Sequence, residues 1–414
     1  MIKILKLITI SANSTLDILY WYIDVKWQNQ SMKMEITKVD EFLPIWISSL
    51  QKLTYVNHKK IIQTLRCLIE EVLKRVSERD PLMACKFRLS GSEREGAKVI
   101  ATNEIDSLCV LLAITFDKFI TPDEAAHHVL KEFVQLKCKE EYEVELQRVL
   151  DSNGCLSRSK IFQNYGAVLS EVLADPDLWE KYPNLQRVSK MDITGSIATI
   201  TPLIVRWNDP TYVNLEVSID TVPALDISGW RPSWADTHPL LDLVKILIVP
   251  KWKTTAVEND TLLEVGVSHW GECFERMPTS MLQGYRLAKV TKELCPQISD
   301  WEWLHIGDLI SSYMLKMTII KLHAATLDLP DQPPPTHSDL HWAREIYKGM
   351  ISSFRDQYLG SFFIPQYNLL YDDKFVTYRE AAIAYCQLCL KLLVPETASH
   401  MRKAYMGIKE DASS

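Results

Sequence analysis

Residues 90–107 read SGSEREGAKVIATNEIDS, and this stretch decides the fold class that we predict. It places a Gly-Ser pair, Gly91 and Ser92, shortly after the strand-like run of residues 87–89, and Glu104 and Asp106 then flank Ile105. Side chains two residues apart on a β-strand point to the same side. We therefore expect Glu104 and Asp106 to face one cleft while Ile105 packs into the core.

The chemistry of this pattern favours metal and phosphate. Two adjacent carboxylates raise each other's proton affinity, so a cation is the natural compensation. Hard oxygen ligands select Mg²⁺ or Mn²⁺, and Mg²⁺ binds substrate phosphates as well. Glycine lets backbone amides approach a phosphate, and the Ser92 hydroxyl adds a donor. Together these features are typical of a nucleotidyltransferase core, in which two metal ions activate a hydroxyl and neutralise the leaving pyrophosphate.

A two-metal site needs a third carboxylate, and Asp220 is the candidate. It lies in NLEVSIDTVPAL, residues 214–225, where Ser218 and Asp220 alternate with apolar neighbours. Glu216 and Asp226 lie nearer the ends of that run and are weaker choices. The alternative interpretation remains open, because an acid-x-acid pair is also typical of the solvent-exposed face of an edge strand.

Composition limits the classes of function. The chain has 414 residues, a formal net charge of -7 and a pI near 5.9, so a surface that is basic throughout is excluded and any nucleic-acid contact must be a local patch. The nine cysteines are scattered and odd in number, which favours reduced thiols in a cytoplasmic protein. Cys386 and Cys389, in CQLC, lie within an apolar helical run and indicate core packing.

The N-terminal residues 1–35 are predicted to be a poorly ordered extension. The apolar run Ile2–Ile10 is interrupted by Lys3 and Lys6 and is too short to span a bilayer. It could imitate a signal peptide, but no typical cleavage site follows, so an appendage and a targeting segment both stay open. No other stretch reaches transmembrane length, and no membrane partner is expected.

The periodicity of the remaining chain predicts an α+β fold with a mixed sheet. Apolar residues recur at helical spacing up to Arg79, and Asp80-Pro81 should end that helix. The expected domains are residues 36–245, a spine helix with the core lobe, and residues 246–414, a helical lobe. Helices are predicted over 123–150 and 161–173, and strands over 87–89, 105–114, 197–207, 213–222, 245–249 and 265–267; residues 329–338 should form a proline-rich loop.

Four motifs in order resemble the cyclic GMP-AMP synthase (cGAS) family, which includes the cGAS-like receptors of animals and the developmental male-abnormal branch. They are SGS with NEID, then VSID, then ISSYMLK at 310–316 and FFIPQYNLL at 362–370. The resemblance covers about residues 57–391. It implies a bilobal nucleotidyltransferase fold, with a mixed-sheet catalytic lobe and a helical C-terminal lobe joined by a long spine helix. It also implies synthesis of a cyclic dinucleotide, cyclic GMP-AMP or a related product, from ATP and GTP in innate antiviral immunity.

The resemblance also assigns site residues. Gly91, Ser92, Glu104, Asp106 and Asp220 match the positions that hold the donor nucleotide and two magnesium ions in active members. Lys289 falls where the family places a lysine on the triphosphate, Ser311 and Ser312 match a phosphate-contacting segment, and Tyr313 matches a tyrosine that stacks on a base. From the residues alone, Lys289 would be a solvated helix lysine and Tyr313 a core aromatic.

Two departures from the family pattern matter. Vertebrate cGAS carries a zinc insertion, whereas here His269 and Cys273 are the only candidate ligands in that region; two ligands do not close a structural zinc site, so no zinc is expected. Glu264 stands where the vertebrate enzyme has an arginine that reads guanine, and Val222 replaces a polar residue. A carboxylate cannot donate to guanine O6 and N7, so the identity of the second base stays open.

The resemblance implies activation by double-stranded nucleic acid, with a dimer on that ligand as one arrangement. The spine helix offers Lys59, Lys60, Arg66 and Lys74, although Glu70 lies among them and a mixed-charge solvated face explains them as well. Double-stranded RNA is recognised by shape and phosphates, and the missing zinc insertion favours RNA over DNA. Two other functions remain: an inactive developmental regulator of the same family, and an enzyme that adds nucleotides to an RNA end.

Overall fold

A computed structural model describes residues 59–99, 104–120, 133–188, 203–208, 214–227, 229–250, 260–267, 270–298, 309–328 and 337–406. All of them belong to one compact unit, Trp46–Ser414. The fold is α+β with a mixed sheet, as the sequence predicts. The N-terminal extension, residues 1–35, lies outside the described residues.

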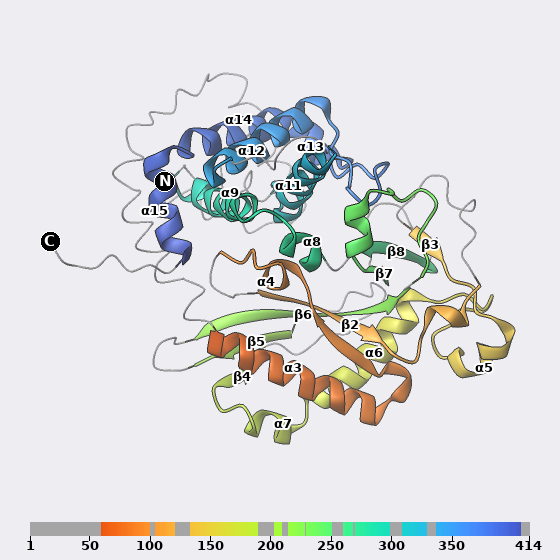
Figure 1. Cartoon of the computed structure of the whole chain (residues 1–414). Helices are drawn as coiled ribbons and strands as arrows, with labels where there is room; N and C mark the ends of the chain where they lie inside the picture. The colour runs from red at the N-terminus through yellow and green to blue at the C-terminus, as the bar shows by residue number, and fades with distance from the viewer. Residues whose placement is uncertain are drawn as a thin grey trace, which may run out of the picture. The chain divides into compact units, whose positions relative to one another are not determined.

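The sheet is built on a pair of parallel strands. Neighbouring strands follow the order β1-β2-β6-β7-β8-β3, and β4 joins through β5 to β6 (Figure 1). β2 and β6 run parallel, and every other described pair is antiparallel. The strands are β1 Cys85–Leu89, β2 Glu104–Leu111, β3 Phe133–Gln135, β4 Leu185–Arg187, β5 Leu203–Trp207, β6 Leu215–Asp226, β7 Ile246–Val249 and β8 Leu262–Val267.

Helices lie on both sides of this sheet (Figure 1). On one side, α3 and α6 pack together, and on the other α4 and α8 lie next to the larger C-terminal helices. The helices are α3 Lys59–Arg79, α4 Gly91–Arg94, α5 Glu143–Leu146, α6 Arg158–Leu173, α7 Pro176–Glu180, α8 Gly271–Glu275, α9 Thr279–Ile298, α11 Ser312–Leu327, α12 Asp339–Asp356, α13 Asp373–Thr377, α14 Arg379–Leu392 and α15 Pro395–Met406. Short 3₁₀ turns are η3 Pro81–Met83, η4 Phe116–Lys118, η6 Glu140–Tyr142 and η7 Pro239–Leu243.

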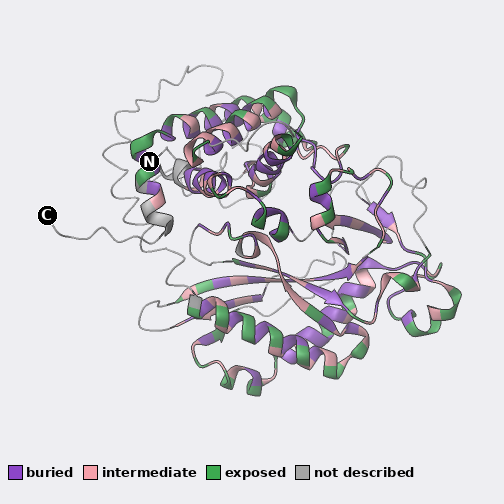
Figure 2. Cartoon of the chain, viewed as in Figure 1, coloured by how far each residue is buried: buried purple, intermediate pink, exposed green. Residues whose placement is uncertain are grey.

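The sequence of helix α3 explains both its buried face and the residue at which the helix ends. Its buried stripe has the predicted helical spacing, with buried purple alternating with exposed green along the ribbon in Figure 2. The stripe consists of Ile61, Leu65, Leu68, Ile69, Val72, Leu73 and Val76. The helix ends at Arg79, as predicted, because Asp80 precedes a proline; the Asp80 carboxylate instead caps η3 by accepting from the Leu82 amide at 3.1 Å.

Strand β2 carries the predicted alternation. Ile105 and Ser107 are buried, whereas Glu104 is exposed and Asp106 half-buried. The strand register places Asp106 directly opposite Asp220 on β6. The Ser107 hydroxyl donates to the backbone carbonyl of Asp220, which fixes the two strands to each other at this level.

The helix predicted over residues 123–150 is wrong in its described part. Phe133–Gln135 is strand β3, paired antiparallel with β8, and only Glu143–Leu146 beyond it is α-helix. The reason is a period-2 pattern that competes with the helical one: Val134, Leu136 and Cys138 are buried, and the residues between them are more exposed. Residues 121–132 lie outside the described part of the chain.

The C-terminal helices form a tightly packed group. Helix α9 lies against α12 so closely that a Cβ on Gly284 would meet the Trp342 Cβ at 2.5 Å. The Tyr347 hydroxyl donates to the Ala288 carbonyl at 2.8 Å, so a buried polar group is satisfied at the same interface. Cys386 and Cys389 are fully buried on α14, which confirms their assignment to the core.

Among the described residues, no helix combines the length and the low charge that a bilayer-crossing segment needs. Within the same part of the chain, eight cysteines form no disulfide, and seven of them are buried.

Candidate active site

Three carboxylates from two adjacent strands converge at one point. Glu104 and Asp106 on β2 and Asp220 on β6 each offer an oxygen, and these oxygens all lie within 4.8 Å of one another. Among the described residues, they form the one group of three or more His, Cys, Asp or Glu side chains close enough to share an ion. Asp106 and Asp220 are half-buried and Glu104 is exposed, so the group opens to solvent on one side.

The Gly-Ser turn lies directly against this carboxylate group. Gly91 adopts φ +61°, a backbone conformation that favours glycine. A Cβ on Gly91 would lie 1.8 Å from Asp106 Oδ2, so no other residue fits at this position without displacing the carboxylate. The Ser90 amide donates to the Asp106 carbonyl at 2.9 Å and holds the turn beside the strand.

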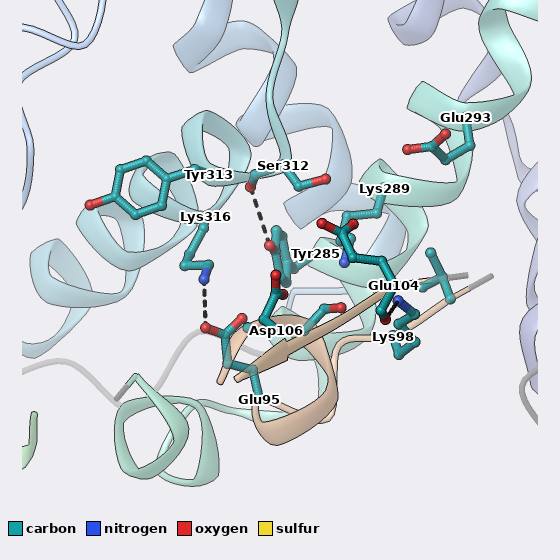
Figure 3. A pocket seen from close by; sticks show the side chains of 13 residues that line it. Glu95, Lys98, Glu104, Asp106, Tyr285, Lys289, Glu293, Ser312, Tyr313 and Lys316 are labelled. Carbon is teal, nitrogen blue, oxygen red and sulfur yellow. Dashed lines mark hydrogen bonds and ion pairs between the residues drawn. The ribbon is translucent and has the colours of Figure 1, made fainter. Parts of the chain in front are cut away.

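A pocket of about 530 Å³ extends from these residues towards the C-terminal helices, a volume typical of small-molecule sites. Its wall is charged with both signs, and Figure 3 shows side chains from the sheet and from the helices pointing into it. The lining residues are Gly91, Ser92, Glu95, Lys98, Val99, Glu104, Asp106, Tyr285, Lys289, Glu293, Ser312, Tyr313 and Lys316. The pocket therefore combines acids that suit a cation with lysines that suit an anion.

Lys289 on α9 is a buried cation in this wall. Its ammonium donates to the Ala97 carbonyl at 3.0 Å, and the residue is 7% exposed. Burial lowers the pKa of Lys289 to about 8; Glu95 opposes that shift, and the ammonium groups of Lys98 and Lys316 add to it. The structure thus brings Lys289 to the pocket, and the alternative of a solvated helix lysine is wrong.

The N-terminus of α11 supplies one side of the pocket. Ser312 and Tyr313 line it, and the Tyr285 hydroxyl donates to the Ser312 carbonyl at 3.3 Å (Figure 3). Tyr313 is 39% exposed, with the Lys316 ammonium 5.7 Å from its ring centroid. Ser311 is instead the N-cap of α11: its hydroxyl accepts from the Met314 amide at 3.2 Å, and it is not among the lining residues.

The two positions predicted to affect base choice lie on β8 and β6, two strands that are separated in the sheet by β7. Glu264, on β8, pairs with Phe133 of β3 and is half-buried. Val222 follows Asp220 on the same side of β6 and is half-buried too. Neither residue lines the pocket described above.

The basic residues predicted on α3 are exposed but have local partners. Arg66 pairs with Glu70 at 3.1 Å and Lys74 with Glu78 at 3.9 Å. The Lys60 ammonium lies 5.8 Å from the centroid of the Trp207 ring. Exposed pairs of this kind are weak, so they leave these cations accessible to a stronger anion. The Lys59 side chain lies outside the described part of the structure.

Of the two zinc-ligand candidates, Cys273 is fully buried on α8. Burial raises the pKa of its thiol to about 12, which disfavours the thiolate that a metal would need. His269 lies outside the described residues.

Sequence reasoning missed several lining residues. Glu95 and Lys98 follow the Gly-Ser turn, Lys316 lies in ISSYMLK, and Tyr285 and Glu293 flank Lys289 on α9. The spacing of Ser312 and Lys316, four residues apart on one helix face, is a signal that could have identified Lys316. Glu95 carries no such signal, because its burial depends on helices distant in sequence.

A comparison with models of known protein families and one with curated protein sequences both find no match for this chain.

Proposed function

We propose that this chain is a metal-dependent nucleotidyltransferase that acts on nucleoside triphosphates. The observation that carries the proposal is the convergence of Glu104, Asp106 and Asp220, with their oxygens within 4.8 Å of one another, beside a glycine turn in contact with Asp106. A solvent-exposed strand face explains neither the third carboxylate nor the close approach of Gly91.

The three side chains fit a divalent metal by their chemistry. All are hard oxygen donors from rigid strands, which suits Mg²⁺ or Mn²⁺. When bound, such ions neutralise charge on the triphosphate and lower the pKa of the attacking hydroxyl. Glu104, Asp106 and Asp220 hold these ions in the proposal, and the fold class of a bilobal nucleotidyltransferase belongs to it as well.

The other pocket residues bind and orient the nucleotide. The backbone amides and hydroxyl of Gly91-Ser92 donate to phosphate oxygens, and the Lys289 ammonium and the Ser312 hydroxyl contact the triphosphate. The exposed Tyr313 ring offers a stacking surface for a base. Ser311 supports this segment as the helix cap, and Glu264 is proposed to influence the second base.

The proposed product is a cyclic dinucleotide formed from ATP and GTP, on the resemblance of the four sequence motifs to the cGAS family. In each of two steps a ribose hydroxyl attacks an α-phosphorus, the bond to the β-phosphate oxygen breaks, and pyrophosphate leaves. The hydroxyl proton passes to a base, for which we propose the Asp220 carboxylate.

Double-stranded RNA is the proposed activator, in cytoplasmic antiviral defence, again on the family resemblance. The exposed side chains of Lys60, Arg66 and Lys74 on α3 support a local phosphate-binding surface on an otherwise acidic protein. RNA recognition through phosphates and shape needs no base-specific contact.

Mass spectrometry of the products tests this proposal. The purified chain is incubated with all four nucleoside triphosphates, Mg²⁺ or Mn²⁺, and double-stranded RNA, double-stranded DNA or neither. We expect a cyclic dinucleotide and pyrophosphate, formed with RNA and abolished by EDTA. Extension of an RNA end indicates the alternative transferase, and no product under any condition favours the inactive regulator.

A further inference from the structure

The segment that follows the Gly-Ser turn is fixed to three helices by four consecutive residues. Each of them makes at least one polar contact with a side chain of α8, α9 or α11 (Figure 3 shows the contact to α11). The contacts are Arg94 to Glu275 at 2.7 Å, Lys316 to Glu95 at 2.5 Å, Arg286 to the Gly96 carbonyl at 2.7 Å, and Lys289 to the Ala97 carbonyl at 3.0 Å. The turn is therefore held by the C-terminal helices as well as by the sheet.

Glu95 differs from the other three because its side chain is a buried charge. The side chain is 2% exposed, and one oxygen accepts from the Lys316 ammonium. The second oxygen, Oε2, is buried and has no hydrogen-bond partner among the described residues. Charged groups are rarely buried in this way without a specific role, because their desolvation is costly.

The two ends of this ion pair belong to the two sides of the pocket. On one side, the Glu95 amide donates to the Gly91 carbonyl at 3.2 Å, and the Ala97 amide donates to the Ser92 carbonyl at 2.9 Å. On the other side, Lys316 lines the pocket on α11 with its ammonium over the Tyr313 ring. Any movement of the turn relative to α11 must therefore break this ion pair or move the Lys316 side chain together with Glu95.

We propose that Glu95 is a positioning residue for the nucleoside triphosphate. Through its ion pair with Lys316, it fixes the position of the Gly91-Ser92 turn relative to the Lys316 ammonium on the other side of the pocket. This inference rests on the proposed function. In this proposal Glu95 acts through the turn and through Lys316, to which its side chain is hydrogen-bonded.

A purely structural role of the ion pair would give a different pattern of stability and function among the variants. Removal of one partner of a buried pair leaves an uncompensated charge, whereas neutral replacements for both partners restore stability. If the pair only stabilises the fold, the double variant E95Q/K316M recovers function together with stability. If the pair positions the triphosphate, stability recovers and function does not.

The experiment measures melting temperature, turnover and triphosphate affinity on the full chain. Affinity is measured by calorimetry with an ATP analogue whose α,β-bridging oxygen is a methylene group, in the presence of Mg²⁺, so that the nucleotide binds under the conditions of turnover and pyrophosphate cannot leave. We expect E95Q to melt about 4 °C or more below wild type and E95Q/K316M to recover most of that loss. We expect E95Q to lower kcat at least about tenfold while its Kd changes less than about threefold, because the lysine charge remains. The double variant should bind the analogue about tenfold more weakly.

The pair Asp339–Arg402 provides the matched control. It is a partly buried ion pair between α12 and α15, with Nε to Oδ2 at 2.5 Å, and neither residue lines the pocket. Asp339→Asn with Arg402→Met should leave turnover and Kd within about twofold of wild type.

The outcomes separate the inference from the proposed function. Equal affinity and turnover of wild type and E95Q/K316M overturn the positioning role. A wild type that binds the analogue and forms no nucleotide product contradicts the proposed function alone, and the affinity of the double variant still decides the positioning role. A wild type that binds no analogue contradicts both.

Discussion

Asp220 is the side chain whose charge the proposed metal centre needs most, because it alone comes from β6. Asp220→Asn keeps the shape and removes one anionic ligand. Loss of several kcal/mol of charge stabilisation should lower activity at least about a hundredfold. The melting temperature in EDTA should not fall, since repulsion among three carboxylates is relieved.

Glu216→Gln is the control for that variant. Glu216 lies on the same strand but is exposed and paired with Arg206 at 2.6 Å. Its activity should match wild type, because exposed pairs contribute little. An Asp220→Asn protein as active as Glu216→Gln would contradict the assignment of the third ligand.

Gly91→Ala should disrupt the site through a single methyl group. The new Cβ would overlap Asp106 Oδ2, so the carboxylate or the turn must move, and a displacement of about 1 Å can cost about a hundredfold in rate. Turnover of Mn²⁺-ATP is the measurement. Gly229→Ala separates this clash from backbone strain: Gly229 has φ +94° and no atom within 4 Å, so that variant should lose about 1–3 kcal/mol of stability and keep its activity.

Lys289 gives the proposed triphosphate contact a pH dependence. Its pKa of about 8 lies below the ordinary 10.5, so the ammonium is present below pH 8 and is lost as the pH rises through 8. The KM for the nucleoside triphosphate should therefore rise about tenfold per pH unit above 8. Lys289→Arg keeps its charge and should remove this rise; an unchanged alkaline limb in that variant would assign it to another group.

The contribution of Lys289 to folding stability changes with pH in the opposite direction. Between pH 8 and 10.5 the unfolded chain binds the proton that folded Lys289 has lost, so this group makes folding more favourable as the pH rises. Above pH 8 the affinity for the triphosphate should therefore fall while the contribution of Lys289 to stability rises. A melting-temperature measurement can thus distinguish a loss of affinity from a loss of structure.

Helix α3 carries the proposed RNA-binding surface on the side opposite its buried stripe. Replacement of Lys60, Arg66 and Lys74 by Ala should weaken binding of double-stranded RNA about tenfold or more, through lost phosphate contacts, and reduce its salt dependence. Product formation without RNA should not change. Lys348→Ala, which removes an exposed lysine paired with Glu345 on α12, is the control; equal RNA affinity in both proteins would place the activator elsewhere.

Some of the helices and strands could be predicted from local sequence patterns, and others could not. α3 follows from its helical spacing and the Asp80-Pro81 stop, and β2 and β6 follow from alternation around their acids. β3 does not, because its three residues are too few to outweigh the helical pattern of their neighbours, and its pairing with β8 depends on chain more than a hundred residues away. Local pattern is decisive where an element is long and one of its faces is buried.

The whole described molecule brings together residues that lie far apart in the sequence. Glu104 and Asp220 meet because β2 and β6 are parallel neighbours, and Lys316 meets Glu95 because α11 packs beside the turn. The carboxylate trio could be predicted, since strand alternation and residue chemistry specify it. Glu95 could not, because its burial and its partner arise only from tertiary packing over 221 positions of sequence separation.

Binding of Mn²⁺ is the most direct test of the central claim that Glu104, Asp106 and Asp220 together hold divalent cations. Electron paramagnetic resonance counts the bound Mn²⁺ in the presence of the methylene ATP analogue, for wild type and Asp220→Asn. The account predicts two bound ions in wild type and the loss of at least one in the variant. The same number bound with the same affinity in both proteins would contradict it.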